Sequence, residues 1–260
     1  EAETTNYLIK THTISYAYSM SYLKDNKKLN RQAKNNFLGF APHSFNYDNL
    51  QSLPRSQSEI KTIETLITGE SFMNLDATKS NFLNTINNYK IIHLSTHANA
   101  NDSIAPWIAF KDDKLYLNEL YTFKNQAELV VLNACKSSLG EINSGEGVFS
   151  LARGFFYSGA NSVISSLWNV NDKSNQEITI SFYKYLKKGK TKSAALRLAK
   201  LDYLEKHSLS EASPYYWSSL ILIGDDSSMK VANYNWLQML IISLLILISI
   251  IFIKKHKNRG

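Results

Sequence analysis

The stretch IIHLSTH, residues 91–97, is a short apolar run that ends in a histidine, as expected for a buried β-strand that carries a polar side chain to a sheet edge. A second stretch, LVVLNAC at 129–135, has the same form and ends in the single cysteine of the chain. In open α/β sheets, reactive groups collect at the carboxyl ends of parallel strands. The two stretches therefore predict a Cys/His dyad of His97 and Cys135, suited to acyl transfer.

Strand-like and helix-like runs alternate along the rest of the chain. Further strands are expected over 12–18, 37–41, 71–75, 107–110, 114–117, 162–167 and 219–223. Helices are expected over 56–67, 78–87, 118–123, 148–158, 173–187 and 191–206, and a solvated loop over 24–34. This alternation predicts an α/β fold with a mainly parallel sheet covered on both faces.

The candidate catalytic residues each have a structural alternative. Cys135 can equally be a small buried apolar residue, which is the commonest role of a free cysteine. His97 can be a hydrogen-bonded histidine at a strand end. His93 lies deeper in the same run, and we expect it to be a core histidine. A zinc site formed by these three residues and a carboxylate is the weakest interpretation, because zinc needs three or four ligands in a suitable arrangement.

Three acidic residues lie near the expected helix starts, and two of them, Glu146 and Asp172, have two interpretations. Glu59 closes the sequence SQSE at 56–59, which matches a helix capping box. Glu146 can orient a base or favour the start of a helix. Asp172 can cap the helix expected over 173–187, or it can line a pocket for a basic side chain. We expect Asp172 to lie at the same sheet edge as the dyad.

The net charge of +7 is concentrated at the C-terminus. Residues 230–260 contain five of the 29 basic residues and no acid, which leaves 24 basic against 22 acidic residues in 1–229. A nearly neutral globular part gives no basic face of the kind that binds nucleic acid. The sequence matches neither a phosphate-binding loop nor a dinucleotide fingerprint, and no cofactor is expected.

The C-terminal region predicts a membrane anchor. Residues 237–253 carry no charge, and as a helix they would span roughly 26 Å, close to the ~30 Å hydrocarbon core. Trp236 precedes the run and the basic sequence KKHK follows it. The basic end would lie in the cytoplasm, and the globular part would then be periplasmic in a bacterium. The alternative is a buried core helix.

These patterns suggest four segments. They are a globular domain over 1–228, a linker over 229–235, a transmembrane helix over 236–253 and a basic tail over 254–260. The chain begins with Glu rather than Met, so we expect it to be a fragment or a processed product.

Five motifs, taken together, resemble the CHAT domain of the caspase–gingipain–separase group of cysteine peptidases. They are IIHLSTHA, LYLNELYTFKNQAELVVLNACKSSLG, GEGVFSLARGFFYSGANSVISSLWNVND, FYKYLKKGKTKSAALRLAK and SPYYWSSLILIG, in this order. The resemblance extends over roughly residues 5–225. It implies a caspase-like three-layer α/β sandwich and a protein or peptide as substrate.

The resemblance also implies roles for individual residues. His97 would be the general base and Cys135 the nucleophile of an endopeptidase. The backbone N–H groups of Cys135 and of a residue near Ala98 would bind the oxyanion. Asp172 matches a separase position that contacts a basic side chain of the substrate, which favours cleavage after Arg or Lys. Such domains often follow tetratricopeptide repeats, which this chain does not contain.

Two positions depart from the family pattern. The family has Gly after the histidine, where this chain has Ala98, and it favours a different loop after the cysteine from Lys136-Ser137-Ser138. An inactive caspase-like module that binds a partner is therefore an alternative function. A sensor whose peptidase is switched on through upstream repeats is another.

Overall fold

The computed structural model describes most of the globular part of the chain. The described residues are 6–99, 105–136, 146–168, 171–208, 210–231 and Leu244, without the side chains of 134–136 and 146–150. The predicted membrane segment, the linker beyond 231 and the basic tail therefore lie outside the described residues, Leu244 apart.

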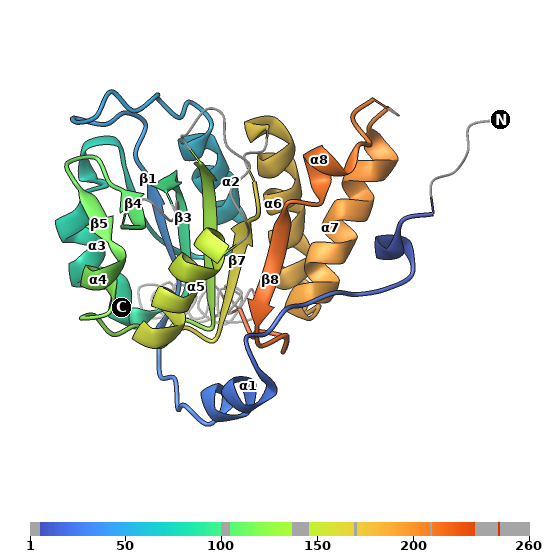
Figure 1. Cartoon of the computed structure of the whole chain (residues 1–260), viewed down its shortest axis with the longest axis horizontal. Helices are drawn as coiled ribbons and strands as arrows, with labels where there is room; N and C mark the ends of the chain where they lie inside the picture. Colours follow the sequence, from blue (N-terminus) through green and yellow to red (C-terminus); the bar gives the residue numbers. More distant parts are fainter. Residues whose placement is uncertain are drawn as a thin grey trace, which may run out of the picture.

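The described strands form an eight-stranded mixed sheet at the centre of the molecule (Figure 1). Its main path runs β2-β1-β3-β6-β7-β8, and the short strands β4 and β5 extend from β3. All neighbours from β2 to β7 on this path are parallel, whereas β8, β4 and β5 pair antiparallel. The strands are β1 Asn35–Ala41, β2 Gly69–Met73, β3 Tyr89–Asn99, β4 Trp107–Ala109, β5 Lys114–Tyr116, β6 Leu129–Lys136, β7 Ser162–Ser166 and β8 Leu220–Gly224.

Helices cover both faces of this sheet, as the alternation of elements predicts. The α-helices are α1 Met20–Lys27, α2 Ser56–Leu66, α3 Lys79–Thr85, α4 Leu117–Leu120, α5 Glu146–Ser158, α6 Asp172–Lys187, α7 Lys192–Lys206 and α8 Pro214–Trp217. Short 3-10 helices are Leu8–Lys10, Asn74–Asp76 and Ile86–Asn88. In Figure 1, α3, α4 and α5 lie on one side of the sheet, and α2, α6 and α7 lie on the other.

Alternation along the central strands divides the core into two clusters. Ile92 and Leu94 of β3 pack with the side chains of α3, α4 and α5. Ile91 of the same strand packs with α2, α6 and α7. Fully burying one such side chain contributes roughly 1.5–3 kcal/mol. Because both faces are buried, β3 and β6 consist of nearly continuous apolar runs, which made these strands recognisable in the sequence.

The sequence-based prediction was wrong in two N-terminal segments. Residues 12–18 form no regular strand, although Tyr16 makes one isolated parallel bridge to Ile223 at the outer edge of β8. Part of the loop expected over 24–34 belongs to helix α1, whose N-cap Ser19 accepts a hydrogen bond from the backbone N–H of Tyr22. Local β-propensity at 12–18 is not sufficient for a strand, because a strand also needs continuous pairing, and the pairing of this segment with β8 is limited to the bridge at Tyr16.

Gly159 ends α5 with a backbone conformation that favours glycine. Its φ is +122°, and a Cβ at this position would lie 2.3 Å from the carbonyl oxygen of Asn125. The predicted helix stop at this glycine is confirmed.

Candidate functional site

The sheet register places His97 and Cys135 directly opposite each other. β3 and β6 are adjacent parallel strands, and Cys135 is the register partner of His97. Both residues lie at the carboxyl ends of their strands, the edge at which open α/β sheets collect reactive groups. The side chain of Cys135 lies outside the described part.

His97 is held by the loop that follows β1. The residue is 5% exposed, and its ring lies beside Phe45, with 5.0 Å between the ring centroids. Nε2 lies 2.7 Å from the backbone carbonyl oxygen of Gln51. A carbonyl oxygen only accepts hydrogen bonds, so Nε2 carries a proton and donates it. This contact defines the orientation of the imidazole.

The other ring nitrogen of His97 is buried. Nδ1 has no hydrogen-bond partner among the side and main chains that the structure describes. With the proton on Nε2, a neutral imidazole presents a lone pair at Nδ1. That nitrogen is suited to accept a proton from a nearby thiol.

Ala98 occupies the family's glycine position in ordinary extended backbone. It lies in β3, opposite Ile108 of β4 on one side and Lys136 of β6 on the other. Among the described non-glycine residues, positive φ occurs at Asp48, Asn49 and Asn74, so Ala98 is not strained. Pairing with the two neighbouring strands gives the backbone of Ala98 its hydrogen-bond partners. That a nearby N–H binds the oxyanion remains a prediction.

His93 is a core histidine, as predicted. It is fully buried, its Nδ1 lies 2.9 Å from the hydroxyl of Tyr183 on α6, and its Nε2 lies 2.8 Å from Oε1 of Glu59 on α2. Both ring nitrogens are therefore occupied, which argues against the zinc interpretation. The described residues contain no group of three or more His, Cys, Asp or Glu that could hold a metal ion.

The predicted capping box at 56–59 does not form. The N-cap of α2 is Arg55, without a side-chain cap, and the hydroxyl of Ser56 donates to the carbonyl oxygen of Leu53 instead. Glu59 points into the molecule, where it is 2% exposed. Its carboxylate accepts hydrogen bonds from Nδ2 of Asn133 at 2.7 and 2.6 Å.

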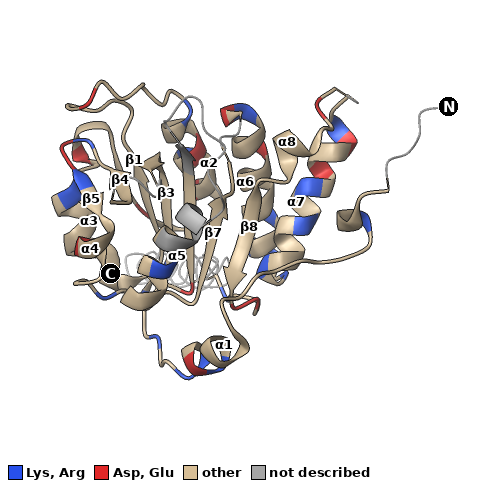
Figure 2. Cartoon of the chain, in the orientation of Figure 1, with Lys and Arg blue, Asp and Glu red and all other residues tan. Residues whose placement is uncertain are grey.

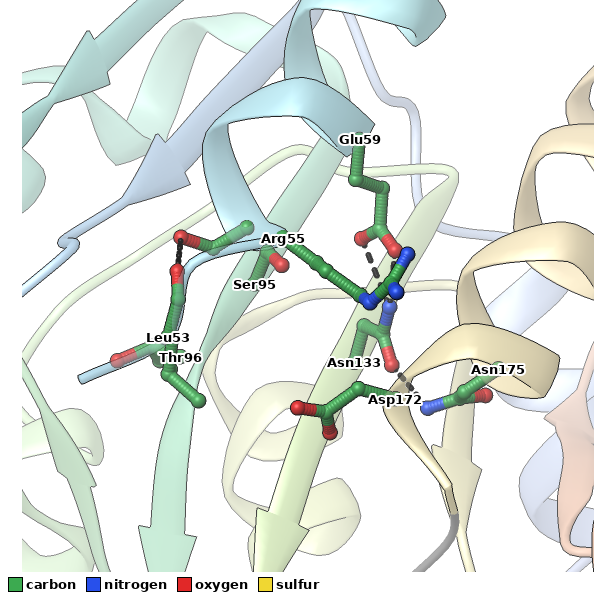
Figure 3. A pocket seen from close by; sticks show the side chains of 9 residues that line it. Leu53, Arg55, Glu59, Ser95, Thr96, Asn133, Asp172 and Asn175 are labelled. Atoms are coloured by element: carbon green, nitrogen blue, oxygen red, sulfur yellow. Dashed lines mark hydrogen bonds between the residues drawn. The ribbon is translucent and has the colours of Figure 1, made fainter. Parts of the chain in front are cut away.

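A polar pocket opens beside the dyad positions (Figure 3). β3, β6, α2 and α6 all contribute to its walls, so one pocket joins the helices of one face to the strands of the candidate dyad. Asp172 is among its lining residues, as expected from its position after β7. The lining residues are Leu53, Arg55, Ser56, Glu59, Ser95, Thr96, Asn133, Asp172 and Asn175.

Asp172 is not the N-cap of its helix. Asn171 has that role, because its side chain accepts a hydrogen bond from the N–H of Lys173 at 2.9 Å. Asp172 is instead the first residue of α6, and its carboxylate belongs to the pocket. The capping alternative for this residue was therefore wrong. Asp172 lines a pocket, and its role toward a basic side chain stays a prediction.

Two other expectations fall on residues that the structure leaves undescribed. The loop after Cys135 and the side chain of Glu146 are outside the described part. The described helices include none with the length and apolar character required to cross a bilayer.

Comparison with known proteins identifies the fold. The CHAT domain family model matches residues 1–225. The Arg-specific cysteine proteinase gingipain R of Porphyromonas gingivalis has a similar structure, with a TM-score of 0.56 at 13% identity, covering 80% of this chain and 52% of that one. Saccharomyces cerevisiae separase, solved with securin, gives a TM-score of 0.53 at 16% identity, covering 82% and 14%. No curated protein sequence matches the chain.

Several residues of this site were not predicted from the sequence. Asn133 could have been found from the sequence, since it is the polar residue of the otherwise apolar run 129–134. The local pattern at 56–59 predicts a helix cap for Glu59 and gives no sign of its place in the pocket. Gln51 could not be found, because it contributes a backbone carbonyl that every residue possesses.

Proposed function

Because the chain belongs to the CHAT domain family, and because His97 and Cys135 are register partners at one sheet edge, we propose that it is a cysteine endopeptidase. The register pairing is the observation that carries the proposal. The environment of His97 supports it, since Gln51 holds Nε2 and leaves Nδ1 to receive a proton.

In the proposed reaction, the sulfur of Cys135 attacks the scissile carbonyl carbon while Nδ1 of His97 takes the thiol proton. The tetrahedral oxyanion is bound by the backbone N–H of Cys135 and by one near Ala98. The C–N bond then breaks, and His97 returns the proton to the leaving amine. Water hydrolyses the thioester, with His97 as its general base, and restores the thiol.

The proposed substrate is a protein or peptide cleaved after a basic residue. Asp172 lines the pocket next to the dyad and brings a carboxyl group to it. The gingipain that shares the fold is Arg-specific by its description. The position of Asp172 supports the same preference here.

Membrane anchoring through 236–253 is a further part of the proposal and depends on the sequence alone. It places a single-pass helix after the peptidase, with the catalytic domain periplasmic in a bacterium and the basic tail cytoplasmic. Flotation of the full chain and of residues 1–231 with lipid vesicles tests it. Equal flotation of the two would contradict an anchor.

The role of Cys135 can be tested directly, because it is the single cysteine of the sequence. Wild type and Cys135→Ala are compared with a peptide library and with an acyloxymethyl ketone probe that labels active thiols. We expect cleavage and labelling in wild type, and neither in the variant, with equal melting temperatures. If both proteins cleave at the same rate, Cys135 is not the nucleophile.

An inactive binding module is the second candidate, and the sequence Lys136-Ser137-Ser138 after the cysteine favours it. In that case neither protein cleaves or is labelled, and a partner copurifies with both. A sensor activated through upstream repeats would instead gain activity only when those repeats are restored.

A further inference from the structure

A chain of buried polar side chains lies beneath the candidate dyad. Tyr183 and His93 are fully buried, and Glu59 and Asn175 are 2% exposed. Tyr183 contacts His93, His93 contacts Glu59, Glu59 contacts Asn133, and Asn133 accepts from Nδ2 of Asn175. These residues come from α2, β3, β6 and α6, the four elements that surround the pocket.

The directions of these hydrogen bonds indicate which groups of the network carry a proton. Burial raises the pKa of Tyr183 well above its usual value, so its hydroxyl keeps its proton. Among the described residues, Nδ1 of His93 is the acceptor that this hydroxyl contacts. With Nδ1 accepting, a neutral His93 donates from Nε2 to Glu59.

Glu59 is therefore an ionised carboxylate. The amide of Asn133 donates to both of its oxygens, and His93 donates to one of them. A protonated carboxyl would have to direct its own O–H toward groups that are already donors. The network as a whole carries one negative charge, which lies on Glu59.

This buried charge lacks a cationic partner within the described part of the chain. The ion-pair contact of Glu59 there is with His93, which the hydrogen bonds assign as neutral. Arg55 lines the same pocket, but no ion pair joins it to Glu59. A buried carboxylate without a counter-charge is costly unless a ligand provides one.

We propose that Glu59 is a specificity-determining residue that, with Asp172, makes the pocket select a guanidinium or ammonium side chain of the substrate. This inference rests on the proposed function and extends it. Glu59 forms the floor of the pocket, since it is almost inaccessible yet lines it. Asp172 is exposed and supplies a second carboxylate nearer the opening.

The network gives the floor its fixed geometry. Asn133 and His93 hold the carboxylate of Glu59 in one orientation, and Tyr183 keeps the tautomer of His93 that donates to it. A carboxylate can accept about four hydrogen bonds, and donors among the described residues supply three of them, which leaves one direction for a substrate cation. His93 and Tyr183 are positioning residues in this arrangement.

The first experiment compares Glu59→Gln with Glu64→Gln, which makes the same charge change on α2 away from the pocket. Both are assayed on peptides that differ only in arginine or citrulline, its neutral isostere, at the cleavage position. We expect Glu59→Gln to lower the arginine-to-citrulline ratio of kcat/KM about 10-fold, the effect of losing one charge-assisted contact. Glu64→Gln should leave it unchanged.

The ratio separates recognition from folding. Both peptides are cleaved by the same preparation, so a partly unfolded variant lowers both rates and leaves their ratio intact. An unchanged ratio in Glu59→Gln overturns the inference. A wild-type preference for aspartate at the cleavage position also overturns it, and would make Arg55 the recognition residue.

A binding measurement tests the same inference without catalysis. Agmatine, a small guanidinium compound, is titrated by NMR into Cys135→Ala and into Cys135→Ala/Glu59→Gln. We expect the Kd for agmatine to be about 10-fold higher in the double variant. If no peptide is cleaved but agmatine binds with this dependence, the peptidase proposal fails and the cation site stands. If Cys135→Ala does not bind agmatine, the cation site fails.

Discussion

The carbonyl oxygen of Gln51 accepts a hydrogen bond from Nε2 of His97 over 2.7 Å. This contact joins the loop after β1 to the end of β3. It directs the unprotonated Nδ1 away from the loop and defines which nitrogen can serve as the base. The candidate dyad therefore depends on the loop as much as on the two strands.

Removing the base should abolish most of the activity. We expect His97→Ala to lower kcat/KM at pH 7 by at least about 100-fold, because a positioned general base contributes roughly 10²–10⁴. Alkylation of Cys135 by iodoacetamide at pH 7 should slow to the rate of a free thiol. His12→Ala, which alters an exposed histidine, is the control. Retention of full activity in His97→Ala would exclude the dyad.

Asp172 should determine charge preference at the pocket opening. We expect Asp172→Asn to lower kcat/KM for peptides with arginine at the cleavage position about 10-fold, because a charge-assisted contact is lost. Peptides with citrulline should change less than 2-fold. Asp76→Asn removes the same charge after β2, outside the pocket, and is the control. An equal fall for both peptides would point to a structural role.

Burial of Lys200 should make stability depend on alkaline pH. Burial lowers the pKa of Lys200 to about 8, and its ammonium donates to the carbonyl oxygen of Leu220. Below pH 8 the buried charge lowers the free energy of unfolding. This destabilisation disappears as the pH rises toward the unfolded pKa of ~10.4, because the lysine is then neutral in both states. Lys200→Met should thus be more stable than wild type at pH 7, by up to about 3 kcal/mol.

This advantage of Lys200→Met should shrink between pH 8 and about 10.5, because wild-type Lys200 then loses its proton. Urea unfolding of both proteins at pH 7 and pH 10 measures the difference. Lys206→Met, at the exposed end of α7, is the control and should show no such trend. A stability difference that is the same at both pH values would contradict the buried charge.

Asp225 and Lys192 form a buried ion pair that should matter for stability. Their side chains are 2% and 1% exposed, with 3.2 Å between Oδ2 and Nζ. Asp225→Ala leaves Lys192 buried without its counter-charge, and we expect a loss of about 3 kcal/mol in the free energy of unfolding. Asp25→Ala, in an exposed pair with Lys28, should cost less than about 1 kcal/mol. Equal losses in urea unfolding would refute the distinction.

Most of the sheet was predictable because its strands are buried on both faces. The runs that end at His97 and Cys135 are β3 and β6, and their register makes the two residues partners. The alternation of strands and helices along the sequence also predicts that most strands pair in parallel. The failure at 12–18 has a different cause, since local β-propensity does not decide pairing, and in this segment Tyr16 alone bridges to β8.

The site was predictable only in part. The sequence SQSE at 56–59 fits a local capping rule, but Glu59 is bound by Asn133 and His93 instead. These partners are distant in sequence, and a local pattern cannot weigh them against a cap. Asp172 had two local interpretations, and Asn171 took the capping role.

The sequence by itself determined which strands are buried and which reactive residues end them, because apolar periodicity and residue chemistry are local properties of the chain. Only the tertiary structure decided that Gln51 orients His97 and that Glu59 forms the floor of the pocket. The first contact uses a backbone carbonyl common to all residues, and the second joins helices and strands that meet only after folding.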